Sequence, residues 1–279
     1  MTDRPTAATR AARTGRSLGA AATYAWNRLA RGIRVDAAPG FVVGCGHSGT
    51  SLLLAILGAH PRIHAIPHES AIATGDARRF ARGCRRFDRW TIAAGKHRWI
   101  EKTPRHILHI GTILAAQPDA RIVVIIRDGR DVAQSIQKRT GSLEEGIRRW
   151  VDDNRAAEPY WRHPQVHRVR YEDLITDFEP TVTRVVEFLG ERYDPRMADY
   201  HRQPRHWYAT SIAKPETAHG EHHNQHRNWQ INQPIFDGRG RWKSLSAIDL
   251  TLIDRIAGPM LAEFGYDRPE PTIQERRAG

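Results

Sequence analysis

Short apolar runs alternate with longer stretches of helical spacing from about residue 40 onward. The runs at 41–43, 63–66, 99–100, 121–126 and 167–171 predict strands. The run at 121–126 is apolar on both faces, which is typical of a central parallel strand covered by helices. Strands that alternate with helices predict an α/β fold with a mainly parallel central sheet and helices on both faces.

The stretches between these runs predict helices. The first follows a Gly-rich turn, spans about 49–59 and stops at His60-Pro61. Later helices are expected near 73–93, 104–116, 130–138, 143–161, 180–189 and 247–264. Because no internal repeat and no linker follows residue 40, we expect residues 39–279 to form one domain.

Residues 1–38 differ from the rest of the chain. They are rich in Ala, Arg, Thr and Ser, and only Asp3 and Asp36 are acidic. We expect a basic extension that is partly disordered or an amphipathic helix, which either packs on its own domain or makes a peripheral membrane contact. No apolar run approaches the roughly 20 residues of a membrane-spanning helix.

The chain is strongly basic. Its 279 residues include 43 Lys and Arg against 31 Asp and Glu, a formal net charge of +12. This charge favours anionic partners, which include nucleic acid, an acidic membrane surface or a small polyanion such as a nucleotide. The two cysteines, Cys45 and Cys84, are too few for a disulfide framework, so a reducing, cytoplasmic location is expected.

The turn at 44–51 joins the first strand to the first helix, where backbone N–H groups converge on an anion. Its residues are Gly44-Cys45-Gly46-His47-Ser48-Gly49-Thr50-Ser51. The spacing is that of a nucleotide-binding P-loop, except that Thr50 stands where that motif has Lys. Hydrolysis of a nucleoside triphosphate would lose a main source of charge stabilisation without that Lys. The fold is therefore expected to be P-loop-like but the chemistry different.

This turn resembles the 5′-phosphosulfate loop of sulfotransferases that use 3′-phosphoadenosine 5′-phosphosulfate (PAPS). The resemblance implies that His47, Ser48, Gly49, Thr50 and Ser51 bind the cofactor. Further segments match the family in the same order, over roughly residues 41–266. The resemblance implies that residues 39–279 form a sulfotransferase catalytic domain.

The second matching segment is Arg127 to Ser135, directly after the run at 121–126. In the family, an Arg and a Ser at these positions clamp the 3′-phosphate, which implies Arg127 and Ser135 here, with Arg139 as a third contact. Asp131 is expected only to cap the following helix.

Two later segments complete the cofactor site. Arg170-Tyr171-Glu172-Asp173-Leu174 is similar to the family's R-Y-E-D-L, which implies that Tyr171 packs near the adenine, with Glu172 as a turn or cap residue. The segment 240–246, G-R-W-K-S-L-S, resembles a loop that folds over the cofactor. Either Arg241 or Lys243 would contact a phosphate there.

The resemblance implies transfer of a sulfuryl group to an acceptor hydroxyl, with no metal required. The sequence resembles the tyrosylprotein and carbohydrate enzymes more than the cytosolic small-molecule type, which implies Glu69 as the base. The spacing from the loop to Glu69 is about one residue longer than in the tyrosylprotein enzymes, so His68 remains an alternative. Pro104 stands where the small-molecule enzymes have a catalytic His, in Lys102-Thr103-Pro104.

Lys102 is then the cation expected near the leaving oxygen, together with His47. Relatives commonly carry Arg or Lys in place of His47, whereas a His is only partly charged near neutrality. The His-rich segment at 219–226 favours a polar loop or lid that contacts the acceptor or cofactor over a metal site.

Two other functions stay open at this point. One is a P-loop kinase or NTPase, and the other is a non-catalytic basic module that binds a nucleotide or nucleic acid. For a sulfotransferase no nucleic-acid partner is expected. The acceptor, which could be a glycan, a lipid, a small molecule or a peptide tyrosine, is expected to contact segments 71–99, 141–161 and 207–236.

Overall fold

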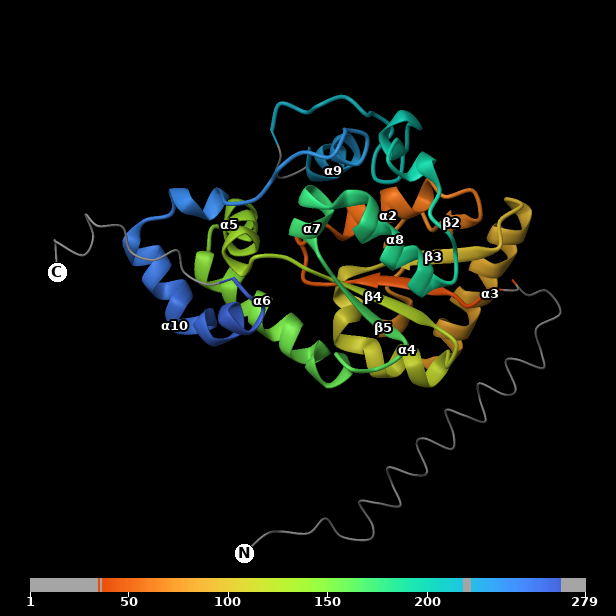
Figure 1. The fold of residues 1–279 in the computed structure, drawn as a ribbon, viewed down its shortest axis with the longest axis horizontal. Coiled ribbons are helices and arrows are strands. Elements are labelled where there is room, and N and C mark those ends of the chain that lie inside the picture. The colour runs from red at the N-terminus through yellow and green to blue at the C-terminus, as the bar shows by residue number, and fades with distance from the viewer. Residues whose placement is uncertain (1–34, 36, 218–221, 267–279) are drawn as a thin grey trace, which may run out of the picture.

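A five-stranded parallel sheet forms the centre of the computed structural model, which describes residues 35, 37–217 and 222–266 (Figure 1). Its order is β2-β3-β1-β4-β5, and every neighbouring pair runs parallel. The expected α/β, P-loop-like fold is therefore confirmed. The strands are β1 (Gly40–Val43), β2 (Ile63–Ala65), β3 (Arg98–Lys102), β4 (Arg121–Ile126) and β5 (Val166–Arg170).

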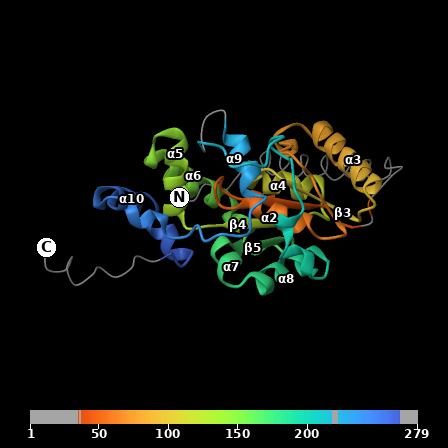
Figure 2. The ribbon, with the colours of Figure 1, turned by 90° about the horizontal axis from the view of Figure 1, so that it is seen from above.

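Helices cover both faces of the sheet. Figure 2 shows α3 on one side of it and α7 and α8 on the other. The α-helices are α2 (Thr50–Gly58), α3 (Ala77–Ala93), α4 (Ile110–Ala116), α5 (Gly129–Thr140), α6 (Leu143–Ala157), α7 (Tyr171–Thr176), α8 (Phe178–Leu189), α9 (His223–Gln230) and α10 (Ala247–Glu263). The 3-10 helices are η1 (Ile72–Thr74), η2 (Pro104–His109), η3 (Glu158–Tyr160), η4 (Pro195–Met197), η5 (Tyr200–Arg202) and η7 (Arg241–Ser244).

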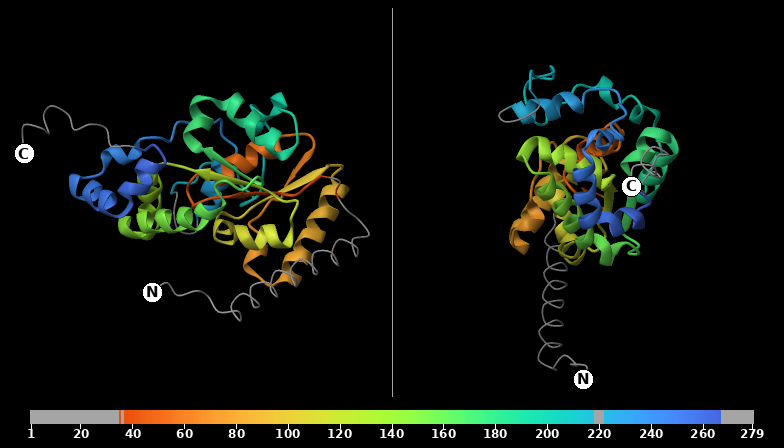
Figure 3. Two further views of the ribbon diagram at one scale, coloured as in Figure 1. Left: turned by 60° about the horizontal axis from the view of Figure 1, so that its bottom comes forward. Right: turned by 90° about the vertical axis from the view of Figure 1, so that its left-hand side faces the viewer.

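Alternate side chains of the inner strands enter two separate cores, because successive residues of a strand point to opposite faces. Phe41 and Val43 of β1 pack in the core shared with α3, α4, α5, α6 and α10. Val42 packs in the other core, against α2 and α8. Figure 3 shows α10 at the end of the molecule away from α3, where it packs against α6. Burial on both faces explains why β1 and, after Arg121, β4 contain only apolar residues and glycine.

Three predicted helices differ from the structure. The stretch at 73–93 is broken after η1, because Asp76 caps a new helix, α3, by accepting the N–H of Arg79 at 2.7 Å. The stretch at 104–116 begins as the 3-10 helix η2 and becomes α-helical only at Ile110. The helix predicted to reach residue 161 ends at Ala157, where Pro159 leads into η3.

The carboxyl ends of all five strands meet at one edge of the sheet, since the strands are parallel. The segments that follow β1 and β4 are neighbours there, because these two strands pair directly. Open α/β sheets bind ligands at this edge. Among the described residues, no helix has the length and apolar character needed to cross a membrane. The amphipathic helix expected within residues 1–38 lies outside the described residues.

Candidate functional site

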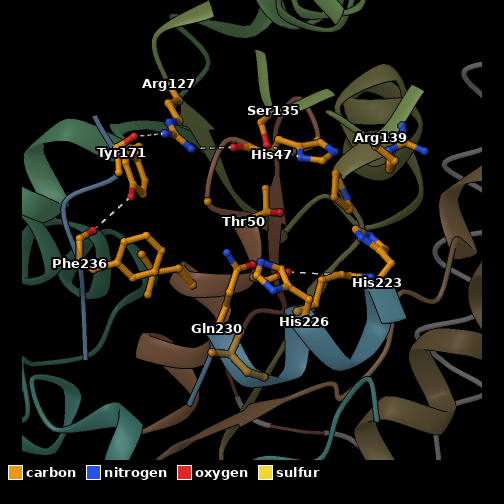
Figure 4. Close-up of a pocket in the computed structure, with 18 of the residues that line it drawn as sticks. His47, Thr50, Arg127, Ser135, Arg139, Tyr171, His223, His226, Gln230 and Phe236 are labelled. Atoms are coloured by element: carbon orange, nitrogen blue, oxygen red, sulfur yellow. Dashed lines mark hydrogen bonds between the residues drawn. The ribbon is translucent and has the colours of Figure 1, made fainter. Parts of the chain in front are cut away.

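A cavity of about 610 Å³ lies at the carboxyl edge of the sheet (Figure 4). Most of the residues predicted to form a site line it. They are His47, Gly49, Thr50, Ser51, Glu69, Arg127, Ser135, Arg139, Tyr171 and Arg241. Ser48, Lys102 and Lys243 do not line it, and neither does His68, whose ring packs against Phe87 and Trp90.

The loop at 44–51 brings the N-terminus of α2 to the cavity. Thr50 begins the helix, so the first backbone N–H groups of α2 lack partners within the helix. The hydroxyl of Ser48 is buried and has no hydrogen-bond partner among the residues that the structure describes. A buried polar group without a partner costs free energy, and an oxyanion at the helix N-terminus would satisfy it. The loop is therefore suited to a phosphate or sulfate group.

Gly49 sits in a conformation that only glycine adopts readily, with φ of 96°. A Cβ at this position would lie 2.7 Å from Cδ2 of Tyr171. Gly49→Ala is therefore expected to lower the free energy of unfolding by about 2–4 kcal/mol, from backbone strain together with a collision in the cavity wall. Urea unfolding would measure the loss.

Gly95→Ala is the matched control. Gly95 also has positive φ, 65°, but a Cβ there would meet nothing within 4 Å. Gly95→Ala is expected to lower the free energy of unfolding by about 1–2 kcal/mol, because it adds backbone strain without a collision. Equal losses in the two variants would contradict the close approach of Tyr171 to the loop.

Arg127 joins the loop at 44–51 to the segment at 236–241. Its guanidinium donates to the carbonyl of His47 at 3.2 Å and to that of Gly238 at 2.5 Å. It also lies 4.4 Å from the ring centre of Tyr171, whose hydroxyl is 3.5 Å from the carbonyl of Phe236. The Nε atom of Arg127 is buried and, within the described part of the chain, has no hydrogen-bond partner. This end of the cavity thus combines a cation with two aromatic rings.

Asp131 anchors the loop that holds Arg241. Its carboxylate accepts the backbone N–H groups of Gly240 at 2.9 Å and Trp242 at 3.0 Å. The expectation that Asp131 only caps a helix is therefore wrong, and the cap is Asp128. The guanidinium of Arg130 lies 3.8 Å from the Trp242 ring centre.

Arg241 and Lys243 take different positions in this loop. Arg241 lines the cavity, whereas Lys243 is exposed and does not line it. Glu172, expected as a turn or cap residue, also does more than that. Its carboxylate accepts the N–H of Asp128 at 3.0 Å and the hydroxyl of Tyr266 at 2.8 Å, so it ties the start of α7 to the start of α5.

Glu69 lies between two cations. One carboxylate oxygen is 2.6 Å from Nζ of Lys102 and 2.5 Å from a guanidinium nitrogen of Arg227. Burial alone would raise the pKa of Glu69, but the charges of Lys102 and Arg227 outweigh burial and lower it below the ordinary value. Glu69 is therefore ionised at neutral pH.

Lys102 does not line the cavity, but its ammonium contacts Glu69, which does. Its side chain is fully buried, and its ammonium lies 5.2 Å from the ring centre of Tyr208. Arg227 covers the same ring at 3.9 Å and also approaches the hydroxyl of Ser51 at 3.4 Å. The structure thus places Lys102 behind Glu69, outside the lining of the cavity.

A buried network supports the segment that carries Glu69. Glu101 is fully buried and accepts both the N–H and the hydroxyl of Ser70, at 3.1 and 2.8 Å, and the hydroxyl of Thr103 at 2.5 Å. His106 Nδ1 lies 3.0 Å from the other oxygen of Glu101, and its Nε2 accepts the N–H of Ala73. His106 must then carry its proton on Nδ1. This network fixes the residue next to Glu69.

His47 stands where the two anion-binding elements meet. It has a left-handed backbone, with φ of 71°, and its Nδ1 is 2.9 Å from the hydroxyl of Ser135 (Figure 4). Burial, reinforced by the positive charges of Arg139 and Arg149, lowers the pKa of His47 to about 4. His47 is therefore neutral at pH 7 in the protein without ligand. The expectation of partial charge near neutrality is wrong in this state.

The lowered pKa predicts acid sensitivity. Between pH 6.5 and about 4 the unfolded chain binds a proton at residue 47 that the folded chain does not, so the free energy of unfolding falls as the pH falls through this range. His47→Asn, which tolerates the left-handed backbone, should show a smaller loss between pH 7 and pH 4.5. Denaturant unfolding at the two pH values measures this, and the exposed His206→Asn, as control, should keep the full wild-type loss. An undiminished loss in His47→Asn would contradict the buried, neutral imidazole.

Three basic residues of the cavity were not singled out from the sequence. They are Lys138 of α5, Arg149 of α6 and Arg227 of α9, of which Arg149 and Arg227 lie in segments expected to contact the acceptor. His223 and His226, which also line the cavity, lie in the His-rich segment at 219–226 that was expected to contact the acceptor or cofactor. The spacing of His223, His226, Arg227 and Gln230 is the one available signal, because it puts them on one face of a helix.

Comparisons with known proteins agree with this architecture. Residues 79–195 match the model of a family described as the sulfotransferase family. The sulfotransferase domain of the Synechococcus PCC 7002 olefin synthase superposes with a TM-score of 0.58 and 16% identity, over 86% of this chain and 98% of that domain. Mouse sulfotransferase SULT7A1, complexed with PAP, gives a TM-score of 0.54 and 18% identity, over 84% and 90% of the two chains.

One curated relative is similar in sequence. It is an uncharacterized protein of Aquifex aeolicus (strain VF5), 24% identical over 214 residues, which cover 62% of this chain and 28% of that protein. The chain therefore spans less than a third of the length of this relative.

Proposed function

We propose that the chain transfers a sulfuryl group from PAPS to an acceptor hydroxyl, because residues 79–195 match the model of the sulfotransferase family and the chain has the fold of sulfotransferase domains. The observation that carries the proposal is the shared cavity. It joins an anion-binding helix N-terminus to the Arg127–Tyr171 pair, which suits the opposite ends of one doubly phosphorylated adenosine.

Two buried polar atoms fit PAPS. The hydroxyl of Ser48 and the Nε of Arg127 both lack hydrogen-bond partners and lie at the two anion-binding elements. We assign the 5′-phosphosulfate to the loop residues Ser48, Gly49, Thr50 and Ser51, and the 3′-phosphate to Arg127 and Ser135. Tyr171 would pack on the adenine, and Arg241 would supply a further cation. When bound, PAPS supplies the sulfuryl group that is transferred.

Arg139 is better assigned to the other end of the cavity than to the 3′-phosphate. It lies one turn beyond Ser135 on α5, about 6 Å farther along the helix axis from Arg127. Figure 4 shows it beyond His47 from Arg127. We therefore propose that Arg139 faces the acceptor.

In the proposed reaction Glu69 takes the proton of the acceptor hydroxyl. A positioned base contributes typically about 10²- to 10⁴-fold to the rate. Lys102 and Arg227 hold the carboxylate ionised and oriented, so Lys102 acts through Glu69. His47, at the junction of the two anion-binding elements, accepts the hydroxyl of Ser135 at Nδ1 in this assignment and would donate a hydrogen bond from Nε2 where negative charge builds on the departing 5′-phosphate.

PAP is the nucleotide that remains when PAPS has given up its sulfuryl group. Calorimetric titration of the full chain with PAP, and separately with ATP and Mg²⁺, tests the proposal. We expect PAP to bind more tightly, and labelled PAPS to pass its sulfuryl group to hydroxyl acceptors. Preference for ATP with Mg²⁺ would instead support a kinase or NTPase. Salt-sensitive DNA binding without PAP binding would support a basic nucleic-acid module.

A further inference from the structure

The cavity contains more basic side chains than those assigned to the nucleotide. Lys138 and Arg139 come from the last turn of α5, Arg149 from α6 and Arg227 from α9. We call these four residues the acceptor-end basic group. Figure 4 shows Arg139 and His223 together on the side of His47 away from Arg127, Tyr171 and Phe236. The positive charge thus extends well past the nucleotide end.

Carboxylates of the protein neutralise this group only in part. Among the described residues, the Lys and Arg residues of α5 and α6 form the ion pairs Arg130–Asp128, Arg148–Glu144 and Arg149–Asp153, so neither Lys138 nor Arg139 takes part in one. Arg149 lies 3.5 Å from Asp153, which Arg105 also contacts at 3.3 Å. Only Arg227 has a close partner, Glu69.

Arg149 lies close to the loop at 44–51. A Cβ on Gly46 would lie 2.9 Å from its guanidinium, so the loop passes this Arg closely. Its charge, with that of Arg139, is among the causes that lower the pKa of His47. Arg227 approaches Ser51 and Glu69 from the other wall. The acceptor-end basic group therefore lines the same cavity as Glu69, with Arg149 close to the loop at 44–51 and Arg227 in contact with Glu69.

Apart from Leu52 and Pro104, the large apolar side chains that line the cavity are Tyr171, Tyr200, Ile231, Ile235 and Phe236. Figure 4 shows Tyr171 and Phe236 on the same side of His47 as Arg127, at the nucleotide end. The aromatic ring beside Glu69 is that of Tyr208, and Arg227 and Lys102 already cover it. A sterol or a phenol would find little apolar surface near Glu69, whereas a polyol would find hydrogen-bond donors.

We infer that the acceptor is an acidic saccharide, a polyhydroxylated chain whose carboxylate or sulfate groups bind Lys138, Arg139 and Arg149 while one hydroxyl faces Glu69. This inference rests on the proposed sulfuryl transfer. Charge-assisted hydrogen bonds from Arg to carboxylates position a substrate as well as bind it. Arg227 belongs to the clamp on Glu69 and is not needed for this recognition.

A matched pair of probes tests the inference. A hyaluronan tetrasaccharide carries two carboxylates, and its carboxyl-reduced form has the same sugars without charge. Calorimetry with the PAP-saturated full chain at 150 mM salt should show at least tenfold tighter binding of the acidic form. Sulfuryl transfer from PAPS should show the same difference in KM. Equal affinities for the two probes, with PAP binding intact, would overturn the inference alone.

The double variant Lys138→Gln, Arg139→Gln separates the basic group from the nucleotide site. It should lose at least tenfold in affinity for the acidic probe, keep its affinity for the reduced probe, and bind PAP within twofold of the wild type. Arg148→Gln, an exposed Arg on α6, is the control and should change none of these. An acidic peptide containing tyrosine that binds more tightly than the tetrasaccharide would overturn the saccharide assignment. Failure of the wild type to bind PAP would instead overturn the proposed function, and this inference with it.

Discussion

Glu69→Gln is expected to lower turnover by about 10²- to 10⁴-fold while the affinity for PAP stays within about twofold of the wild type. The amide retains a carbonyl oxygen for Lys102 and Arg227 but cannot take a proton at neutral pH. Gln is preferable to Ala here because Lys102 is fully buried, and removal of its acceptor would leave an uncompensated buried charge. Stopped assays with labelled PAPS measure the turnover, and calorimetry measures the binding.

The pH profile sharpens this prediction. The pKa of Glu69 is below its ordinary value, so the base stays ionised from pH 7 down to pH 5 and no loss of activity from Glu69 is expected in that range. Glu144→Gln, in an exposed ion pair with Arg148, is the control and should leave turnover unchanged. Near wild-type turnover in Glu69→Gln, with PAP still bound, would move the base to another residue.

Glu101 illustrates a part of the site that the sequence did not reveal. The motifs predict Glu69, Lys102 and the loop at 44–51 because these residues follow strands, and strand ends meet at one edge of a parallel sheet. Glu101 and His106 carry no motif, and their role depends on burial and on contacts with Ser70 and Ala73, about 30 residues earlier. Such contacts are set by tertiary packing and leave no local periodicity.

Two further contacts of the site join residues that are far apart in the sequence, so they could not be predicted from it either. Arg227 contacts Glu69 across 158 residues, and Asp131 binds Gly240 across 109. No local pattern in the sequence indicates that the two residues of either pair are in contact. The start of α3, by contrast, has a local signal in the sequence. Gly75 and Asp76 directly before it are a turn residue and a helix cap, so this boundary could have been predicted. The fold class was predictable because it depends on the strand pattern alone.

The second large effect is expected at Arg127. Arg127→Ala should weaken PAP binding by about 10- to 150-fold, the loss of one or two charge-assisted hydrogen bonds of about 1.5–3 kcal/mol in all. The guanidinium also holds the carbonyls of His47 and Gly238, so its removal loosens the contact between the loop at 44–51 and the segment at 236–241. Turnover at low PAPS concentration should fall by at least the same factor.

Arg127→Lys distinguishes charge from geometry. The Lys ammonium keeps the charge but lacks the rigid, planar group that bridges two carbonyls and a phosphate. We therefore expect an intermediate loss of PAP affinity, about tenfold. Arg148→Ala, which removes an exposed Arg of α6, should leave PAP affinity unchanged. If both Arg127 variants bound PAP like the wild type and retained the native circular dichroism, the 3′-phosphate would have to lie away from the end of β4. The two anion-binding elements would then serve separate ligands, and the shared cavity would no longer argue for one nucleotide.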